Sequence, residues 1–227
     1  RCHRCDYQQP LPVHCPACES PAIEIVGVGT ERLVQDAEML FPDASIVRMD
    51  SDALRRKGEL ERRLGAIRDG HYNLIIGTQI LSKGHDFPQI TLVSALLADV
   101  SLNLPDFRAA ERTFQVLTQM AGRAGRGADP GQVLIQTYSP EHYALAHVRT
   151  HNVAAFTEEE LALRKAVQLP PYTSMVLVWA SSPDDARAEL LVNRVAEQLQ
   201  RVLRPDVRLL GPEEAPIKRL SNRYRWM

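Results

Sequence analysis

The sequence lacks the features that would mark a membrane protein or a generally basic nucleic-acid-binding protein. No apolar run approaches the roughly 18 residues that indicate a membrane-spanning helix. The formal net charge is -1, so any contact with DNA would have to come from local basic patches. The chain begins with arginine instead of methionine, and no secretory signal is visible. We therefore expect an excised piece of a longer cytoplasmic protein that does not bind a membrane.

Cysteine is absent beyond residue 18, because all 4 cysteines form two CxxC pairs near the beginning of the sequence. Two such pairs supply four thiolates, which suit tetrahedral zinc, and four sulfur ligands leave no open position for a catalytic water. A pair of disulfides is the alternative, but it conflicts with a cytoplasmic location. We predict a structural zinc-binding segment over residues 1–22, with Cys2, Cys5, Cys15 and Cys18 as ligands.

Strand-like and helix-like segments alternate from residue 23 to about residue 150. The expected strands are residues 23–26, 45–49, 74–77, 91–97 and 131–137. The expected helices include one with Thr30 as its N-cap, one over 59–68, and a long one that begins near Asp106. The long helix is expected to bury Phe107, Ala110, Phe114, Leu117 and Ala121. This alternation predicts a parallel sheet and a RecA-like lobe over residues 23–150.

A first motif, Gly77 to Pro88, follows one of the expected strands. Open α/β sheets bind ligands at the carboxyl ends of their strands. Thr78, Lys83 and Gly84 could hold a phosphate there, and Asp86 could accept hydrogen bonds from a ribose. A simple Gly-Thr turn is the alternative interpretation.

A second motif, Gln119 to Arg126, lies at the end of the long helix. Arg123 and Arg126 are separated by small residues, so both could approach a triphosphate closely and offer planar guanidinium groups to its oxygens. The alternative is a helix end broken by glycine, with basic residues that interact with the helix dipole. The order of the two motifs along the chain favours the nucleotide site.

Residues 151–227 predict a second, small α/β domain. A capping box at 157–160 is expected to open a helix that ends before the prolines at 170–171. Residues 174–180 predict a strand, and residues 182–185 are expected to open another helix. That helix is expected to have one apolar face, formed by Ala188, Leu191, Val195, Leu199 and Val202.

The last residues of the sequence, 223–227, are basic and aromatic and look like the start of a strand. We therefore expect the second domain to be truncated. Arg225 and Trp226 are the candidates in this run for stacking on DNA bases or for holding a partner peptide. A solvated surface is the alternative.

Taken together, these motifs resemble those of superfamily two helicases, and most closely those of the primosomal replication-restart helicases. The resemblance covers nearly the whole chain. It rests on the cysteine pairs and on residues 27–31, 77–88, 106–112, 119–126 and 168–172. RNA helicases share the glutamine-arginine motif but lack the cysteine pairs and the Leu-Pro-Pro-Tyr segment. The implied fold is a RecA-like helicase lobe two with an N-terminal zinc-binding segment and a small α/β C-terminal domain.

By that resemblance, Gln119, Arg123 and Arg126 would face ATP and Mg²⁺ bound mainly on a missing first lobe. Arg126 would be the arginine finger that stabilises charge on the transferred phosphoryl group. The sequence contains neither a GxxxxGK[ST] loop nor an acidic magnesium-binding motif. We therefore expect the chain alone to be inactive as an ATPase.

The resemblance also implies roles in binding DNA and metal. Thr78 and Lys83 would contact phosphates of the DNA strand along which the helicase moves. Gly84 and Asp86 would transmit the state of the bound nucleotide to these DNA contacts. In the family, eight cysteines bind two zinc ions in a crossed arrangement. This chain has 4 cysteines, so one metal, two half-sites and no metal all stay open.

The implied function is that of an ATP-dependent DNA helicase that remodels stalled replication forks and initiates primosome assembly. Branched and single-stranded DNA, the tail of single-stranded DNA-binding protein and other primosome proteins would be its partners, and Arg225 with Trp226 would serve these contacts. The main alternative is a non-enzymatic module of the primosome that is stabilised by zinc, binds DNA or protein and has lost the use of ATP. An RNA helicase relative is a further one.

Overall fold

The structure is a computed structural model that describes residues 12–15, 18–21, 29–78, 87–122, 124 and 130–227. The contacts divide the chain into two compact units, and each is described by itself below. One unit is Glu24–Val167, and the other is Gln168–Met227 together with the N-terminal segment Arg1–Ile23. The expected strand over residues 23–26 lies outside the described residues.

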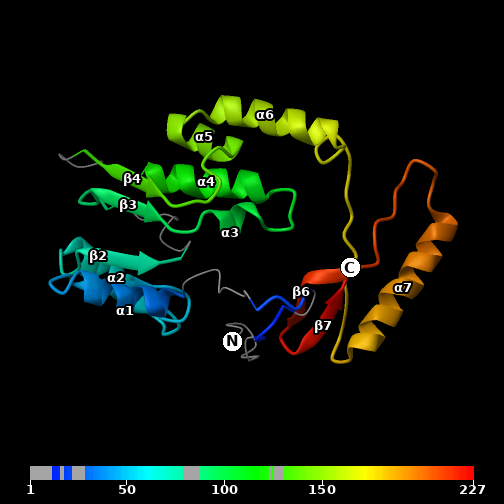
Figure 1. Cartoon of the computed structure of the whole chain (residues 1–227), viewed down its shortest axis with the longest axis horizontal. Coiled ribbons are helices and arrows are strands. Elements are labelled where there is room, and N and C mark those ends of the chain that lie inside the picture. The colour runs from blue at the N-terminus through cyan, green and yellow to red at the C-terminus, as the bar shows by residue number, and fades with distance from the viewer. Residues whose placement is uncertain (1–11, 16–17, 22–28, 79–86, 123, 125–129) are drawn as a thin grey trace. The chain divides into compact units, whose positions relative to one another are not determined.

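Two pairs of parallel strands lie in the unit Glu24–Val167 (Figure 1). β1 (Ile46–Met49) pairs with β2 (Leu74–Gly77), and β3 (Leu92–Ala95) pairs with β4 (Gln132–Ile135). The parallel pairing agrees with the prediction, but the described strands form two separate two-stranded sheets and not the single predicted sheet. β2 has the predicted bounds, and the other three strands are shorter than their predicted ranges.

Helices α1 (Thr30–Leu40) and α2 (Glu59–Arg68) belong to the same part of the unit as β1 and β2 (Figure 1). α2 has its predicted bounds, and Gly58 precedes it with a φ of 81°, a conformation that favours glycine. Gly29, not Thr30, is the N-cap residue of α1, so that prediction is wrong. The Thr30 hydroxyl instead donates a hydrogen bond to a side chain at the end of β1. The core here consists of Val47, Met49, Leu64, Ile67 and Phe87.

The long helix α4 (Ala109–Ala121) follows the short helix α3 (Asp99–Leu102). It begins later than predicted because Asp106 forms a turn, in which its carboxylate accepts the backbone N–H of Arg108 at 2.9 Å. Of the side chains predicted to be buried, Phe114, Leu117 and Ala121 are buried, whereas Phe107 and Ala110 are half-buried.

Helices α5 (Tyr143–Thr150) and α6 (Val153–Ala166) continue this unit beyond residue 150. α5 packs against α4, and α6 packs against α5. Together with α3 and α4 they surround a second core cluster, formed by Ala98, Phe114, Leu117, Ala144, Leu145, Val148 and Phe156. This helical layer is part of the compact unit that ends at Val167.

The predicted capping box at 157–160 is wrong. α6 begins at Val153, and its N-cap Asn152 accepts the backbone N–H of Ala155 at 3.0 Å. Thr157 therefore lies inside the helix, where its hydroxyl donates to the Val153 carbonyl. The carboxylate of Glu160 is buried and contacts Tyr143 on α5 and Arg164 on α6 itself instead of the helix start.

The C-terminal unit contains an antiparallel three-stranded sheet in the order β5-β7-β6. Its strands are β5 (Ala180–Ser182), β6 (Glu214–Leu220) and β7 (Arg223–Trp226). The prediction of a strand over residues 174–180 is wrong except at Ala180, because the residues before it have no strand partner. Residues 175–179 are apolar and exposed, and Val176 is 90% exposed.

Helix α7 (Asp185–Val202) packs against β5 and β7. The side chain of its N-cap Asp184 accepts the backbone N–H of Arg187 at 3.2 Å, which confirms the predicted helix start. The predicted buried face is only partly correct. Ala188, Val192 and Ala196 are the buried residues, one turn apart, whereas Leu191 and Val202 are exposed. Small side chains at this spacing let the helix approach the sheet closely.

In the part of the chain that the structure describes, no helix has both the length and the apolar character needed to cross a membrane.

Candidate functional site

The predicted site residues are only partly within the described residues. Those outside are Cys2, Cys5, Lys83, Gly84, Asp86, Arg123 and Arg126. Those that can be placed are Cys15, Cys18, Thr78, Gln119, Arg225 and Trp226. They fall into a group on the α/β unit and a group on the C-terminal unit with the N-terminal segment.

Gln119 lies in the last turn of α4, and its side chain is exposed. The buried residues Phe114, Leu117 and Ala121 occupy the opposite side of the helix, as the 3.6-residue period requires. Gly122 caps the helix directly before the two predicted arginines. The helix thus presents the first residue of the motif to solvent while its other face is held in the core.

Thr78 is exposed and follows the last residue of β2. Its backbone N–H donates to the carbonyl of Met49 at 3.4 Å. Because Met49 is opposite Gly77 in the parallel register, Thr78 and Asp50 both follow the carboxyl ends of neighbouring strands. This is the edge at which open α/β sheets bind ligands.

Asp50 is a buried carboxylate at this edge that sequence analysis missed. It accepts hydrogen bonds from the Thr30 hydroxyl, from Arg48 Nε at 2.5 Å and from the backbone N–H of Ala53 at 2.8 Å. Burial alone would raise the pKa of the carboxyl, but these bonds outweigh it and hold the pKa well below its ordinary value. The signal that could have revealed it is a charged residue placed directly after a buried strand.

Asp99, the first residue of α3, binds the segment that follows β4. Its carboxylate accepts the hydroxyl of Thr137 and the backbone N–H of Tyr138, both at 3.0 Å. Burial opposes ionisation, but the hydrogen bonds outweigh it and lower the pKa of Asp99.

A partly buried charge network joins α4, α5 and α6. Arg164 contacts Glu111 at 2.7 Å and Glu160 at 2.6 Å, and the Tyr143 hydroxyl donates to Glu160 at 2.5 Å. Arg164 also lies over the ring of Phe107, 5.1 Å from its centroid. Burial lowers the pKa of Arg164, but its hydrogen bonds to Glu111 and Glu160 outweigh this effect and raise it. Burial and Glu160 together raise the pKa of Tyr143.

Arg225 and Trp226 are neighbours on β7 and therefore point to opposite faces of the sheet. The Trp226 indole N–H donates to Asp185 at 2.8 Å, which also binds Lys218 at 3.0 Å. The Arg225 guanidinium lies over the ring of Trp179, 4.1 Å from its centroid. The two candidates thus do not form one stacking surface, and each already contacts a neighbour within the unit.

Cys15 is half-buried and Cys18 is exposed, with no disulfide between these two described residues. The turn that carries them is closed by Glu19, whose backbone N–H donates to the Cys15 carbonyl at 2.8 Å and whose φ is 55°. Two thiols on one tight turn fit half of a tetrahedral zinc site. No group of three or more metal-binding side chains occurs among the described residues, a search that does not reach Cys2 and Cys5.

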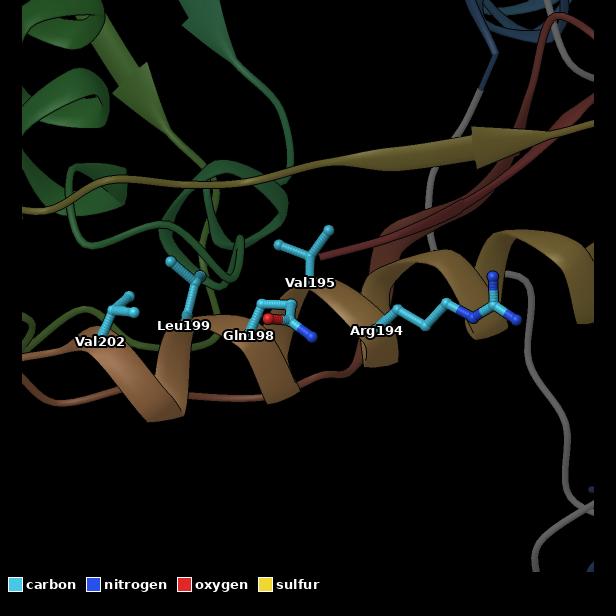
Figure 2. A pocket seen from close by; sticks show the side chains of 5 residues that line it. All are labelled: Arg194, Val195, Gln198, Leu199 and Val202. Carbon is cyan, nitrogen blue, oxygen red and sulfur yellow. The ribbon is translucent and has the colours of Figure 1, made fainter.

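A shallow groove of about 360 Å³ runs along α7, where the side chains of Val195, Leu199 and Val202 follow one another on the helix (Figure 2). Arg194 and Gln198 complete its lining. This is the apolar face that the sequence predicted to be in the core. None of the predicted site residues that the structure describes lines this groove.

Comparisons with known proteins agree with the two parts of the chain. The helicase conserved C-terminal domain matches residues 23–128, and the primosomal protein N C-terminal domain matches residues 165–227. The replication restart protein PriA of Bacillus subtilis is 42% identical over 226 residues. The match covers 100% of this chain and 28% of that relative.

Two further relatives have the same name. PriA of Synechocystis is 42% identical, with 100% of this chain and 27% of the relative covered. PriA of Haemophilus influenzae is 39% identical, with 100% of this chain and 31% of the relative covered. The chain therefore spans less than a third of the length of these proteins. It belongs to the PriA family of replication restart proteins, whose C-terminal region it matches over its full length.

Proposed function

We propose that this chain is the second RecA-like lobe and the C-terminal part of an ATP-dependent DNA helicase that remodels stalled replication forks and initiates primosome assembly. The observation that carries the proposal is the position of Gln119. It is exposed at the end of a helix whose other face is buried, directly before the arginine motif. A nucleotide bound by another lobe could reach residues presented in this way. The PriA relatives support the assignment to replication restart.

Arg126 is proposed as the arginine finger, with Arg123 and Gln119 beside it on the triphosphate. A guanidinium is suited to this role because it offers several N–H donors in one plane to the phosphate oxygens. ATP with Mg²⁺ would be held mainly by the first lobe. This chain would supply charge that stabilises the transition state, so it would not hydrolyse ATP by itself.

The carboxyl edge of β1 and β2 is proposed to contact DNA. Thr78 is exposed at this edge, where its hydroxyl could donate to a phosphate oxygen. Lys83 would add a positive charge for the same backbone, and Gly84 with Asp86 would connect this contact to the nucleotide. The buried Asp50 would stabilise this edge, because its carboxylate binds both the Thr30 hydroxyl on the first turn of α1 and the backbone N–H of Ala53 after β1.

The cysteine pairs are proposed to bind Zn²⁺ as a structural metal. Cys15 and Cys18 would supply two thiolates from one turn, and Cys2 with Cys5 would supply the others. Zinc would hold together a segment with little apolar content of its own. Whether the four thiolates share one ion or belong to two sites is decided by the metal content of the chain.

The C-terminal unit is proposed to bind branched and single-stranded DNA and the tail of single-stranded DNA-binding protein, together with other primosome proteins. Arg225 and Trp226 are the proposed contacts. Because they point to opposite faces of the sheet, one face would take the nucleic acid and the other the peptide.

Arg126→Ala in the longer protein tests the motor function. Loss of an arginine finger lowers kcat for ATP hydrolysis by about 10³-fold or more, whereas Arg149→Ala, an exposed arginine on α5, should leave kcat unchanged. Equal activity of the two variants would refute the role of Arg126. DNA-stimulated ATP hydrolysis by the 227-residue chain alone would refute its dependence on another lobe. A longer protein that binds DNA without hydrolysing ATP would support the non-enzymatic module.

A further inference from the structure

Arg164 is the centre of the contacts between α6 and the beginning of α4. Its side chain is 11% exposed and bridges Glu111 on the first turn of α4 and Glu160 on α6 itself. Glu160 is 9% exposed and also accepts the hydroxyl of Tyr143 on α5. A single guanidinium thus contacts two carboxylates, and one of these contacts a third helix.

The apolar contacts reinforce the same junction. The rings of Phe114 on α4 and Phe156 on α6 are stacked, with centroids 3.9 Å apart. Arg164 lies on the ring of Phe107, just before α4. A side chain that is buried, charged and held by two carboxylates cannot change rotamer without leaving a charge unpaired. The junction therefore has one strongly preferred geometry.

The two helices that meet at this junction end at functionally different places. α4 ends with the turn that carries Gln119, directly before the arginine motif. α6 ends at Ala166, next to Val167, where one compact unit ends and Gln168 begins the other. The charge network therefore holds the end of α6 against the first turn of the helix whose last turn carries Gln119.

We propose that Arg164 is a positioning residue that holds α6 against the first turn of α4 through its contacts with Glu111 and Glu160. It thereby couples the helix of the arginine motif to the end of α6, from which the chain continues into the C-terminal unit. Arg164 does not contact nucleotide or DNA in this role. It acts through the orientation of α4 and through the point at which the chain leaves α6. The proposal has a functional half, the effect of Arg164 on ATP hydrolysis, which rests on the helicase function proposed above. Its positional half, the effect of Arg164 on the orientation of α4, does not rest on that function.

Hydrogen–deuterium exchange on the 227-residue chain tests the positional half. Glu111→Gln removes the negative charge that pairs Arg164 with α4 and leaves the Arg164–Glu160 pair, so this variant remains informative if Arg164→Met does not fold. Amides in the last turn of α4 should exchange about two- to thirty-fold faster in either variant, and Arg164→Lys should restore part of the protection. Arg149→Met, which removes an exposed arginine from α5, should leave exchange in α4 unchanged. Unchanged protection of α4 in Glu111→Gln would overturn the proposal.

ATP hydrolysis by the longer protein tests the coupling. Loss of a structural contact lowers the folded fraction and reduces basal and DNA-stimulated kcat in proportion, without changing their ratio. Loss of coupling reduces the DNA stimulation by about two- to thirty-fold while the basal rate and the KM for ATP stay nearly constant. Full DNA stimulation in both Glu111→Gln and Arg164→Met would overturn the coupling. If the unmodified protein shows no ATP hydrolysis, the proposed helicase function fails, and the exchange experiment alone decides the positional role.

Discussion

The rings of Phe114 on α4 and Phe156 on α6 lie parallel, with centroids 3.9 Å apart and 6° between their planes. Both side chains are 4% exposed and belong to one core cluster. The helix of the glutamine-arginine motif is therefore held by a helix that begins more than 30 residues after that motif's first residue. The packing of α6 is thus part of what orients the candidate site.

Phe156→Ala is expected to lower the free energy of unfolding by about 3–5 kcal/mol, because it removes a buried ring and leaves a cavity against Phe114. Urea denaturation followed by circular dichroism measures this change. Val153→Ala, at an exposed position of the same helix, should change the free energy by less than about 0.5 kcal/mol. A Phe156→Ala loss as small as that of the control would show that the aromatic stack does not stabilise the unit.

Asp50→Asn is expected to lower the free energy of unfolding at neutral pH by about 1–3 kcal/mol, since the amide leaves some of the donors around Asp50 without an ionised acceptor. Asp43→Asn, an exposed substitution in the same unit, is the control and should have little effect. A loss in the control equal to that of Asp50→Asn would show that the hydrogen bonds to Asp50 contribute nothing specific.

The same carboxylate predicts a dependence on pH. The pKa of Asp50 in the folded chain lies below its ordinary value of 3.8, so the folded state binds the proton less tightly than the unfolded state. Its stabilisation is therefore complete well above pH 3.8 and is lost as the pH falls below that value. Urea titrations at a series of pH values should show a steeper acid loss for the unmodified chain than for Asp50→Asn. Parallel pH profiles would contradict this.

Cys18→Ser is expected to reduce the zinc content of the chain, because serine does not replace a thiolate ligand of zinc. Elemental analysis of the purified, reduced chain measures it, with Ser20→Ala as a control on the same turn. About one equivalent in the unmodified chain indicates a shared four-cysteine site, and less than about half an equivalent indicates two half-sites. An equal zinc content in Cys18→Ser and in the unmodified chain would exclude Cys18 as a ligand.

Trp226→Ala is expected to weaken binding of single-stranded DNA by about 5- to 150-fold, the range for one base stacked on an aromatic side chain. Trp226→Phe separates stacking from structure, because phenylalanine keeps a ring but loses the hydrogen bond to Asp185. It should retain most of the affinity. Fluorescence anisotropy of a labelled oligonucleotide at fixed salt measures both, with Tyr172→Ala, an exposed aromatic in the same unit, as the control. Equal weakening by the alanine and phenylalanine variants would assign Trp226 a structural role.

Local sequence patterns correctly predicted the elements that are determined by their own residues and not by distant partners. α2 and β2 have the predicted bounds, and the exposed end of α4 carries Gln119 where the motif placed it. Their apolar spacing, glycine positions and length sufficed. The positions of these elements are therefore readable from the sequence, whereas the roles of Gln119 and Thr78 stay predictions.

Elements and contacts that depend on distant partners were missed. Residues 174–179 have the composition of a strand, but a strand requires a neighbour to accept its hydrogen bonds, and composition does not reveal one. The face of α7 was predicted correctly at Ala188 but misjudged beyond it, because the helix packs on the sheet through Val192 and Ala196 and leaves Leu191 exposed. The ion pair between Arg164 and Glu111 joins residues 53 positions apart, and no local pattern marks it.

The C-terminal unit has a very small interior. Its buried apolar residues, among those described, are Val192 and the alanines at 180, 188, 196 and 215. An alanine removes little apolar area from water, and stabilisation scales with that area at about 25 cal/mol per Å². Fluctuations that expose cleavable backbone should therefore be more frequent in this unit than in the aromatic-rich helical layer. A brief digestion with a nonspecific protease is expected to cut within residues 174–227 first and to leave the helicase-like unit as the surviving fragment.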